Sequence, residues 1–140
     1  MTGLQLLDFY SPTAGFDQPL ALVEACHVRV GRMVEMLMRL LEHLREHGAD
    51  ERAGVSARTV QQYFDEAWPR HRQDEELELF ARVKLRLQGR GAQAQPILEA
   101  IDTLTGEHRE LDDLWGAVRA GLQAVQQGDA QGLQQAAVSR

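Results

Sequence analysis

The stretch "WPRHRQDEELELF", residues 68–80, places a histidine and a glutamate on one face of an expected helix. His71 and Glu75 are four residues apart, so their side chains lie one helical turn apart and can converge. Apolar side chains continue this face at steps of three or four, namely Phe64, Ala67 and Leu79. Because a buried ionisable group without a partner costs a few kcal/mol, this face needs a ligand or a counter-charge.

Two further histidines interrupt apolar stripes with the same helical spacing. His27 belongs to the series Leu20, Val23, His27, Val30, Val34, Leu37, Leu41 and Leu44. His108 belongs to the series Ile97, Ile101, Leu104, His108, Leu111, Trp115, Val118, Leu122 and Val125. Neutral imidazoles and carboxylates are metal ligands, and one cation site satisfies all of them at once. The sequence therefore predicts a metal site formed by His27, His71, Glu75 and His108.

The elements that must position these residues are helices, since no alternation typical of strands competes with the helical period. Helices are expected over residues 17–48, 56–88, 96–127 and 129–140. Asp17, Ser56 and Asp129 are the expected N-caps, Gly48 ends the first helix and Pro96 begins the third. Three helices of about 30 residues would each be about 45 Å long. Joined by short loops, they predict an all-α, up-down antiparallel four-helix bundle.

Composition restricts the classes of protein that remain. A length of 140 residues fits one domain, with residues 1–16 as an extension and residues 17–140 as the bundle. A net charge of −6, without a basic stripe, argues against nucleic acid as a partner. The single cysteine, Cys26, excludes an internal disulfide framework, and no segment reaches the roughly 20 apolar residues of a membrane helix. We therefore expect a soluble, cytoplasmic protein with no membrane partner.

The other ionisable residues have simpler interpretations. His43 and His47 lie among charged residues and are expected on a solvated face, and Cys26 is expected to pack. Solvent exposure is also expected for three acidic neighbours of Glu75, namely Asp74, Glu76 and Glu78. Asp112, one turn after His108, could join the site, although solvent is favoured. Packing is expected of both tryptophans, Trp68 and Trp115, and Pro69 is expected to kink the second helix.

Three motifs resemble the hemerythrin-like, or HHE cation-binding, family: "ACHVRV", "WPRHRQDEELELF" and "LTGEHRELDDLW". The resemblance runs from Pro19 to the C-terminus and implies a four-helix bundle that holds two non-haem irons. In this family histidines are terminal ligands and carboxylates bridge the metals. Carried over by position, His27, His71 and His108 would be terminal ligands and Glu75 a bridge. The implied function is to bind or sense oxygen, nitric oxide or iron.

The sequence departs from the family pattern at two places. Arg72 stands where many relatives have a second histidine, and the histidine and carboxylate expected on the fourth helix are missing after Gly128. This leaves open a metal-free helical interaction module, or a di-iron enzyme that oxidises substrates or repairs iron centres. No set of nucleophile, base and orienting group is evident, so binding is favoured over catalysis.

The expected fourth helix has only eleven residues after Asp129 and would be about 16 Å long. Such a helix would cover one end of the bundle and leave apolar seams exposed at the level of the histidines. We therefore expect either that the natural chain continues past Arg140 into a full fourth helix, or that a homodimer covers the groove.

Overall fold

The computed structural model describes residues 19–138, and within them all regular structure is helical. Its elements are α1 (Pro19–His47), α2 (Glu51–Gln73), a π-helical segment (Asp74–Leu79), α3 (Phe80–Leu87), a 3₁₀ turn (Gly91–Gln93), α4 (Gln95–Gln126) and α5 (Gln131–Val138). The expected N-terminal extension and the expected cap at Asp17 lie outside the described residues.

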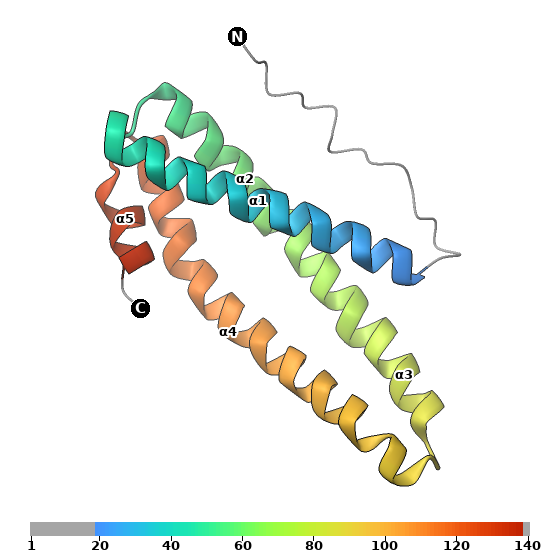
Figure 1. The fold of residues 1–140 in the computed structure, drawn as a ribbon. Helices are drawn as coiled ribbons and strands as arrows, with labels where there is room; N and C mark the ends of the chain where they lie inside the picture. The colour runs from blue at the N-terminus through green and yellow to red at the C-terminus, as the bar shows by residue number, and fades with distance from the viewer. Residues whose placement is uncertain (1–18, 139–140) are drawn as a thin grey trace.

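The helices form an antiparallel bundle. Figure 1 shows that α2, the π-helical segment and α3 make one long continuous helix, and that α4 runs back beside it. The first helix, α1, lies across the long helix, and the short α5 packs against α4 at the end of the bundle where α1 ends and α2 begins. The prediction of an all-α bundle with a short fourth helix is confirmed.

The second helix begins earlier than the sequence analysis predicted. Its N-cap is Asp50, whose Oδ1 accepts a hydrogen bond from the backbone N–H of Ala53 at 2.9 Å. The same oxygen lies 2.8 Å from Nε2 of His43, on the last turns of α1. Gly48, with φ of 70°, ends α1 and leaves only a short turn before Asp50. The expectation of a cap at Ser56 was wrong because Asp50 already satisfies the first free N–H groups.

The apolar core lies at one end of the bundle, where four segments meet. Buried side chains from the end of α1, the start of α2, the end of α4 and α5 form one cluster: Leu40, Leu41, Leu44, Ala53, Ala57, Val60, Leu122, Val125 and Leu133. A Cβ atom added at Gly121 would lie 2.7 Å from Cα of Leu133. Glycine at this position therefore permits the close approach of α5 to α4.

A polar group ties α2 to α4 beside this core. The Asp65 carboxylate accepts hydrogen bonds from Nε1 of Trp115 at 3.1 Å and from Nε of Arg119 at 2.9 Å and 3.0 Å. The Trp115 ring also packs against Phe64, with ring centroids 5.1 Å apart. Trp115 packs as expected. Its hydrogen bond to Asp65 also orients α2 and α4 relative to each other.

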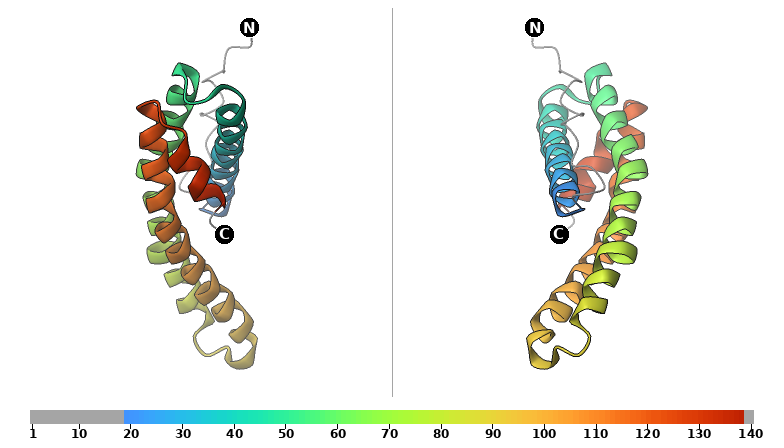
Figure 2. Two further views of the ribbon diagram at one scale, coloured as in Figure 1. Left: turned by 90° about the vertical axis from the view of Figure 1, so that its left-hand side faces the viewer. Right: turned by 90° about the vertical axis from the view of Figure 1, so that its right-hand side faces the viewer.

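The other end of the bundle is open. Figure 2 shows that α3 and the first part of α4 extend beyond α1 and α5. Several positions of the predicted apolar stripes are consequently exposed: Leu20, Val34, Ile97, Leu104 and Leu111. The sequence analysis placed these residues on the inward faces of their helices. They do lie on those faces, but within residues 19–138 no further helix covers them. Among the same residues, no helix has both the length and the hydropathy that crossing a membrane requires.

Candidate metal centre

A π-helical turn carries the central carboxylate. Between α2 and α3 the backbone N–H of Phe80 donates to the carbonyl of Glu75, five residues earlier, as in a π-helix. Such turns add a residue to the helical repeat and are frequent at functional sites. The sequence analysis expected a regular helix here, and its only irregularity was Pro69, which lies inside α2 one turn before the π-helical segment.

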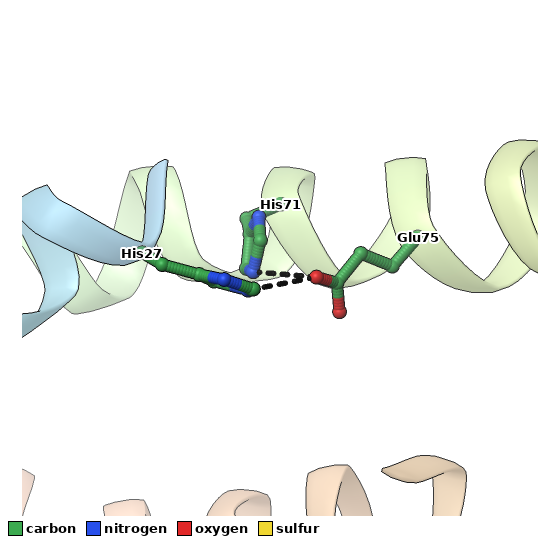
Figure 3. Close-up of side chains that lie close together, drawn as sticks. All are labelled: His27, His71 and Glu75. Carbon is green, nitrogen blue, oxygen red and sulfur yellow. Dashed lines mark hydrogen bonds and ion pairs between the residues drawn. The ribbon is translucent and has the colours of Figure 1, made fainter. Parts of the chain in front are cut away.

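Glu75 lies at the point where the three predicted histidines meet. Its Oε1 is 2.9 Å from Nε2 of His27 and 3.2 Å from Nε2 of His71. Figure 3 draws these two contacts as dashed lines. Its other oxygen, Oε2, is 3.1 Å from Nε2 of His108 on α4. The structure thus brings together the four residues that the sequence analysis selected, from three different helices.

The four residues do not form a single compact set of ligand atoms. One ligand atom each from His27, His71 and Glu75 lie within 4.8 Å of one another, and this group does not include His108. Glu75 therefore presents one carboxylate oxygen to a pair of imidazoles and the other oxygen to a single imidazole.

Burial differs among the ligand candidates. His71, Glu75 and His108 expose only 5–6% of their surface, whereas the side chain of His27 is 59% exposed. His27 was predicted at an inward position, and its ring does point to Glu75, with its centroid 5.0 Å from that of His71. It is exposed because that side of α1 has no neighbouring helix among the described residues.

Burial also affects the protonation of His71. Desolvation lowers the pKa of this imidazole below its usual value, although the nearby Glu75 carboxylate opposes the shift. The neutral imidazole, which is the form that binds metals, is favoured as a result.

His108 is held at both ring nitrogens. Its Nδ1 lies 2.8 Å from Oε1 of Glu76, while its Nε2 faces Glu75. The expectation that Glu76 belongs to a solvated face was therefore wrong: its side chain is 29% exposed and points to α4. Asp74 and Glu78 are exposed, as predicted, and Glu78 pairs with Arg82. A regular α-helical period places Glu76 off the inward face. The π-helical turn changes this period, but it leaves no mark in the apolar pattern of the sequence.

A groove of about 440 Å³ lies over the histidines between α1, α2 and α4, and it is open to solvent. Its walls combine the three imidazoles with apolar and aromatic side chains, mainly Val30, Trp68, Leu104 and Leu111. The Trp68 ring lies 5.8 Å from that of His71 and 5.7 Å from that of His108. The packing role predicted for Trp68 therefore includes contacts with two candidate ligands, His71 and His108.

Arg72 and Asp112 form an ion pair at the margin of the site. Their side chains are in direct contact, and Nε1 of Trp68 lies 3.4 Å from Oδ1 of Asp112. Asp112 is exposed, as favoured by the sequence analysis, and its carboxylate faces the Arg72 guanidinium. Asp112, which lies one turn after His108 on α4, is thus an ion-pair partner of Arg72.

The remaining candidates lie elsewhere. His43 is half-buried and bonds to Asp50 at the end of α1, so it is not simply solvated, whereas His47 is exposed. Their rings are 4.8 Å apart. Cys26 is half-buried beside His27, and burial raises the pKa of its thiol, which favours the protonated form.

The sequence also matches a known family and a curated protein. Residues 18–138 match the family described as "Hemerythrin HHE cation binding domain". An uncharacterised protein of Haemophilus influenzae is 29% identical over 113 residues, which cover 80% of this chain and 61% of that relative. The chain therefore spans about three fifths of the length of the curated relative it matches. No solved structure matches the chain significantly.

Proposed function

Because the chain belongs to the hemerythrin HHE cation-binding family, we propose that it binds iron at this centre, as a carboxylate-bridged pair of non-haem ions. The residues that would hold the metals are His27, His71, Glu75 and His108. Three imidazoles and one carboxylate are a donor set suited to iron and other first-row divalent metals. Iron bound there would supply an open coordination position for a small diatomic ligand, oxygen or nitric oxide.

The observation that carries the proposal is the division of the Glu75 carboxylate. Its Oε1 lies beside Nε2 of both His27 and His71, and its Oε2 lies beside Nε2 of His108. A carboxylate that only neutralised one protonated histidine would not need a second and third imidazole around it. A bridge between two cations would leave each cation in need of further ligands, and an imidazole stands beside each of the two oxygens.

The two sides of the bridge are unequally equipped. Among the described residues, the first side offers two imidazoles and Oε1, and the second side offers one imidazole and Oε2. We therefore expect the first iron to bind more tightly than the second. Full occupation of the second position would need ligands beyond these four, from water or from another segment.

The chain's own residues define what reaches the site. Burial keeps His71 and Glu75 away from bulk water, and Trp68 packs over two of the imidazoles. The groove walls are largely apolar, so a small neutral ligand would enter without losing strong hydrogen bonds to water. This favours binding or sensing of oxygen, nitric oxide or iron itself over turnover of a large polar substrate. A cytoplasmic location remains a prediction from the sequence.

The test is the iron stoichiometry of the purified chain. After anaerobic loading with ferrous iron and removal of the excess, elemental analysis should give between one and two irons per chain. Exposure to air should then produce ligand-to-iron charge-transfer absorption in the near ultraviolet. The matched variant Glu75→Ala should lose most of this iron, because it removes the carboxylate oxygen that faces the imidazoles on each side of the site. A wild-type chain that retains no iron would overturn the proposal.

The same experiment decides the alternative of a metal-free interaction module. That alternative is favoured by exposed apolar side chains of α1 and α4, among them Val34, Leu104 and Leu111, of which the two leucines line the groove. An iron-free chain that still keeps its helical fold would support it.

A further inference from the structure

Two consecutive glutamates, Glu75 and Glu76, contact the two ring nitrogens of a single histidine, His108. His108 Nε2 lies 3.1 Å from Oε2 of Glu75, and His108 Nδ1 lies 2.8 Å from Oε1 of Glu76. The imidazole is 6% exposed, so water does not compete strongly for either nitrogen. An ionised carboxylate only accepts hydrogen bonds, so the short contact to Glu76 requires a proton on Nδ1.

The proton on Nδ1 determines what Nε2 can do. With Nδ1 protonated, a neutral imidazole has its lone pair on Nε2, and that lone pair faces Oε2 of Glu75. Two acceptors 3.1 Å apart repel each other unless a positive charge stands between them. A metal ion held on this side of the centre would supply that charge. The contact from Glu76 therefore prepares Nε2 as a ligand atom on the side where Glu75 also offers an oxygen.

The π-helical turn explains how adjacent residues achieve this. Glu75 and Glu76 both belong to the segment Asp74–Leu79, in which the helix is wound with i to i+5 hydrogen bonds. Glu75 is buried at the bridge position, and Glu76, still on the side of α4, reaches past it to the far nitrogen of His108. Phe80, the first residue of α3, lies nearly parallel to the His108 ring, with ring centroids 6.4 Å apart.

We propose that Glu76 is a positioning residue for the metal centre: it holds His108 with its proton on Nδ1 and so presents Nε2 to the metal. This inference rests on the proposed function. A carboxylate behind a metal-bound histidine fixes the orientation of the ring and raises its basicity, and removing such a partner typically lowers metal affinity by about 10- to 100-fold.

The variants Glu76→Ala and Glu76→Gln separate hydrogen bonding from charge. The glutamine carbonyl can still accept from Nδ1–H, whereas alanine cannot. We expect Glu76→Ala to weaken binding of ferrous iron by about 10- to 100-fold and Glu76→Gln to retain most of the affinity. Glu78→Ala removes an exposed acidic residue of the same π-helical segment and should bind iron like the wild type. Equal losses in the alanine and glutamine variants would show a purely electrostatic effect and overturn the positioning role.

A second measurement reports on the imidazole itself. In the protein loaded with Zn²⁺, which is diamagnetic, nitrogen-15 NMR should show a slowly exchanging proton on Nδ1 of His108. This signal should persist in Glu76→Gln and Glu78→Ala and disappear, through exchange with water, in Glu76→Ala. Circular dichroism of each variant checks its fold, and loss of the Nδ1 signal in Glu76→Ala with an unchanged helical spectrum attributes the loss to the missing carboxylate.

The outcomes distinguish the two proposals. A wild-type chain that binds neither iron nor zinc overturns the proposed function and this inference with it. A wild-type chain that binds both metals, together with a Glu76→Ala variant of unchanged affinity and an unchanged Nδ1 signal, overturns the role of Glu76 alone.

Discussion

His71 is the best single residue on which to test the centre. It is buried, its Nε2 lies 3.2 Å from Oε1 of Glu75, and burial lowers the pKa of its imidazole. It therefore combines the two properties of a metal-binding histidine, neutrality and a partner ligand one helical turn away. His27 contacts the same oxygen of Glu75, but its side chain is largely exposed. Its contribution to the metal affinity therefore depends more on how freely this side chain moves.

We expect His71→Ala to lose most of its iron and to keep its helices. The substitution removes one of the two imidazoles on the better-equipped side and leaves a cavity beside Trp68, which costs stability without disrupting the core cluster at the other end. Elemental analysis gives the iron content and circular dichroism the helix content.

The control for this prediction is His43→Ala. His43 is a half-buried histidine that bonds to Asp50 at the end of α1 and takes no part in the centre. Its iron content should equal that of the wild type. If both alanine variants lost the same amount of iron, the assignment of His71 as a ligand would be wrong.

At the scale of the elements, the packing of α5 on α4 depends on one glycine. A Cβ atom at position 121 would lie 2.7 Å from Cα and 2.8 Å from the backbone N of Leu133, so one of the two helices would have to move. We expect Gly121→Ala to lower the free energy of unfolding by about 1–3 kcal/mol, as overpacking does. Thermal or chemical denaturation measures this loss.

Gly116→Ala is the matched control on the same helix. A Cβ atom at Gly116 meets nothing within 4 Å, so alanine there should leave stability unchanged or raise it by about 0.5–1 kcal/mol through its higher helix propensity. Equal effects of the two substitutions would show that contact with Leu133 does not limit the approach of α5.

The Asp65 carboxylate makes the attachment of α2 to α4 dependent on pH. Burial alone would raise its pKa, but hydrogen bonds from Arg119, Trp115 and Gln61 outweigh burial and hold the pKa below the usual aspartate value. A depressed pKa stabilises the folded state above the usual aspartate pKa of about 3.9, and this stabilisation disappears as the pH falls through the lower, folded-state pKa.

We therefore expect Asp65→Asn to destabilise the protein by about 1 kcal/mol at neutral pH, a modest loss because the pair is partly exposed. The difference from the wild type should shrink below about pH 4. Denaturation curves at several pH values measure it, with the exposed Asp113→Asn as the control. A difference that stays constant down to the lowest pH would contradict the assigned cause.

At the scale of the whole molecule, the described helices leave apolar side chains exposed around the open groove. Exposed apolar side chains of α1 and α4 line or flank it, among them Val34, Leu104 and Leu111, and α5 covers only the end near the core, as Figure 1 shows. A contiguous apolar face of this kind normally packs against another helix or another protein.

We predict that the 140-residue chain, purified by itself, pairs through this groove into a homodimer. Leu111→Glu should shift it toward the monomer, because a buried carboxylate without a partner is costly. Analytical ultracentrifugation gives the dissociation constant. Leu85→Glu replaces an equally apolar, exposed residue of α3 that does not line the groove, and it should leave the association unchanged. A monomeric wild-type chain at micromolar concentration would contradict the prediction.

Local periodicity was enough to predict the class of the fold and the four side chains that lie together around Glu75. Gly48 and Pro96 mark helix ends through their own backbone preferences, and His71 and Glu75 are neighbours because any helix places residues four apart on one face. These inferences need no knowledge of distant residues. For the same reason the stripes that contain His27 and His108 could be recognised one helix at a time.

Only the tertiary structure decided how these faces combine. Which oxygen of Glu75 meets which histidine depends on the spacing between α1, the long helix and α4, and no sequence pattern encodes that distance. The contact of Glu76 with His108 depends on a π-helical turn that an α-helical period cannot reveal. The exposure of His27 and Leu111 depends on whether a neighbouring helix is present, because periodicity specifies a face, whereas burial is a property of everything packed against that face.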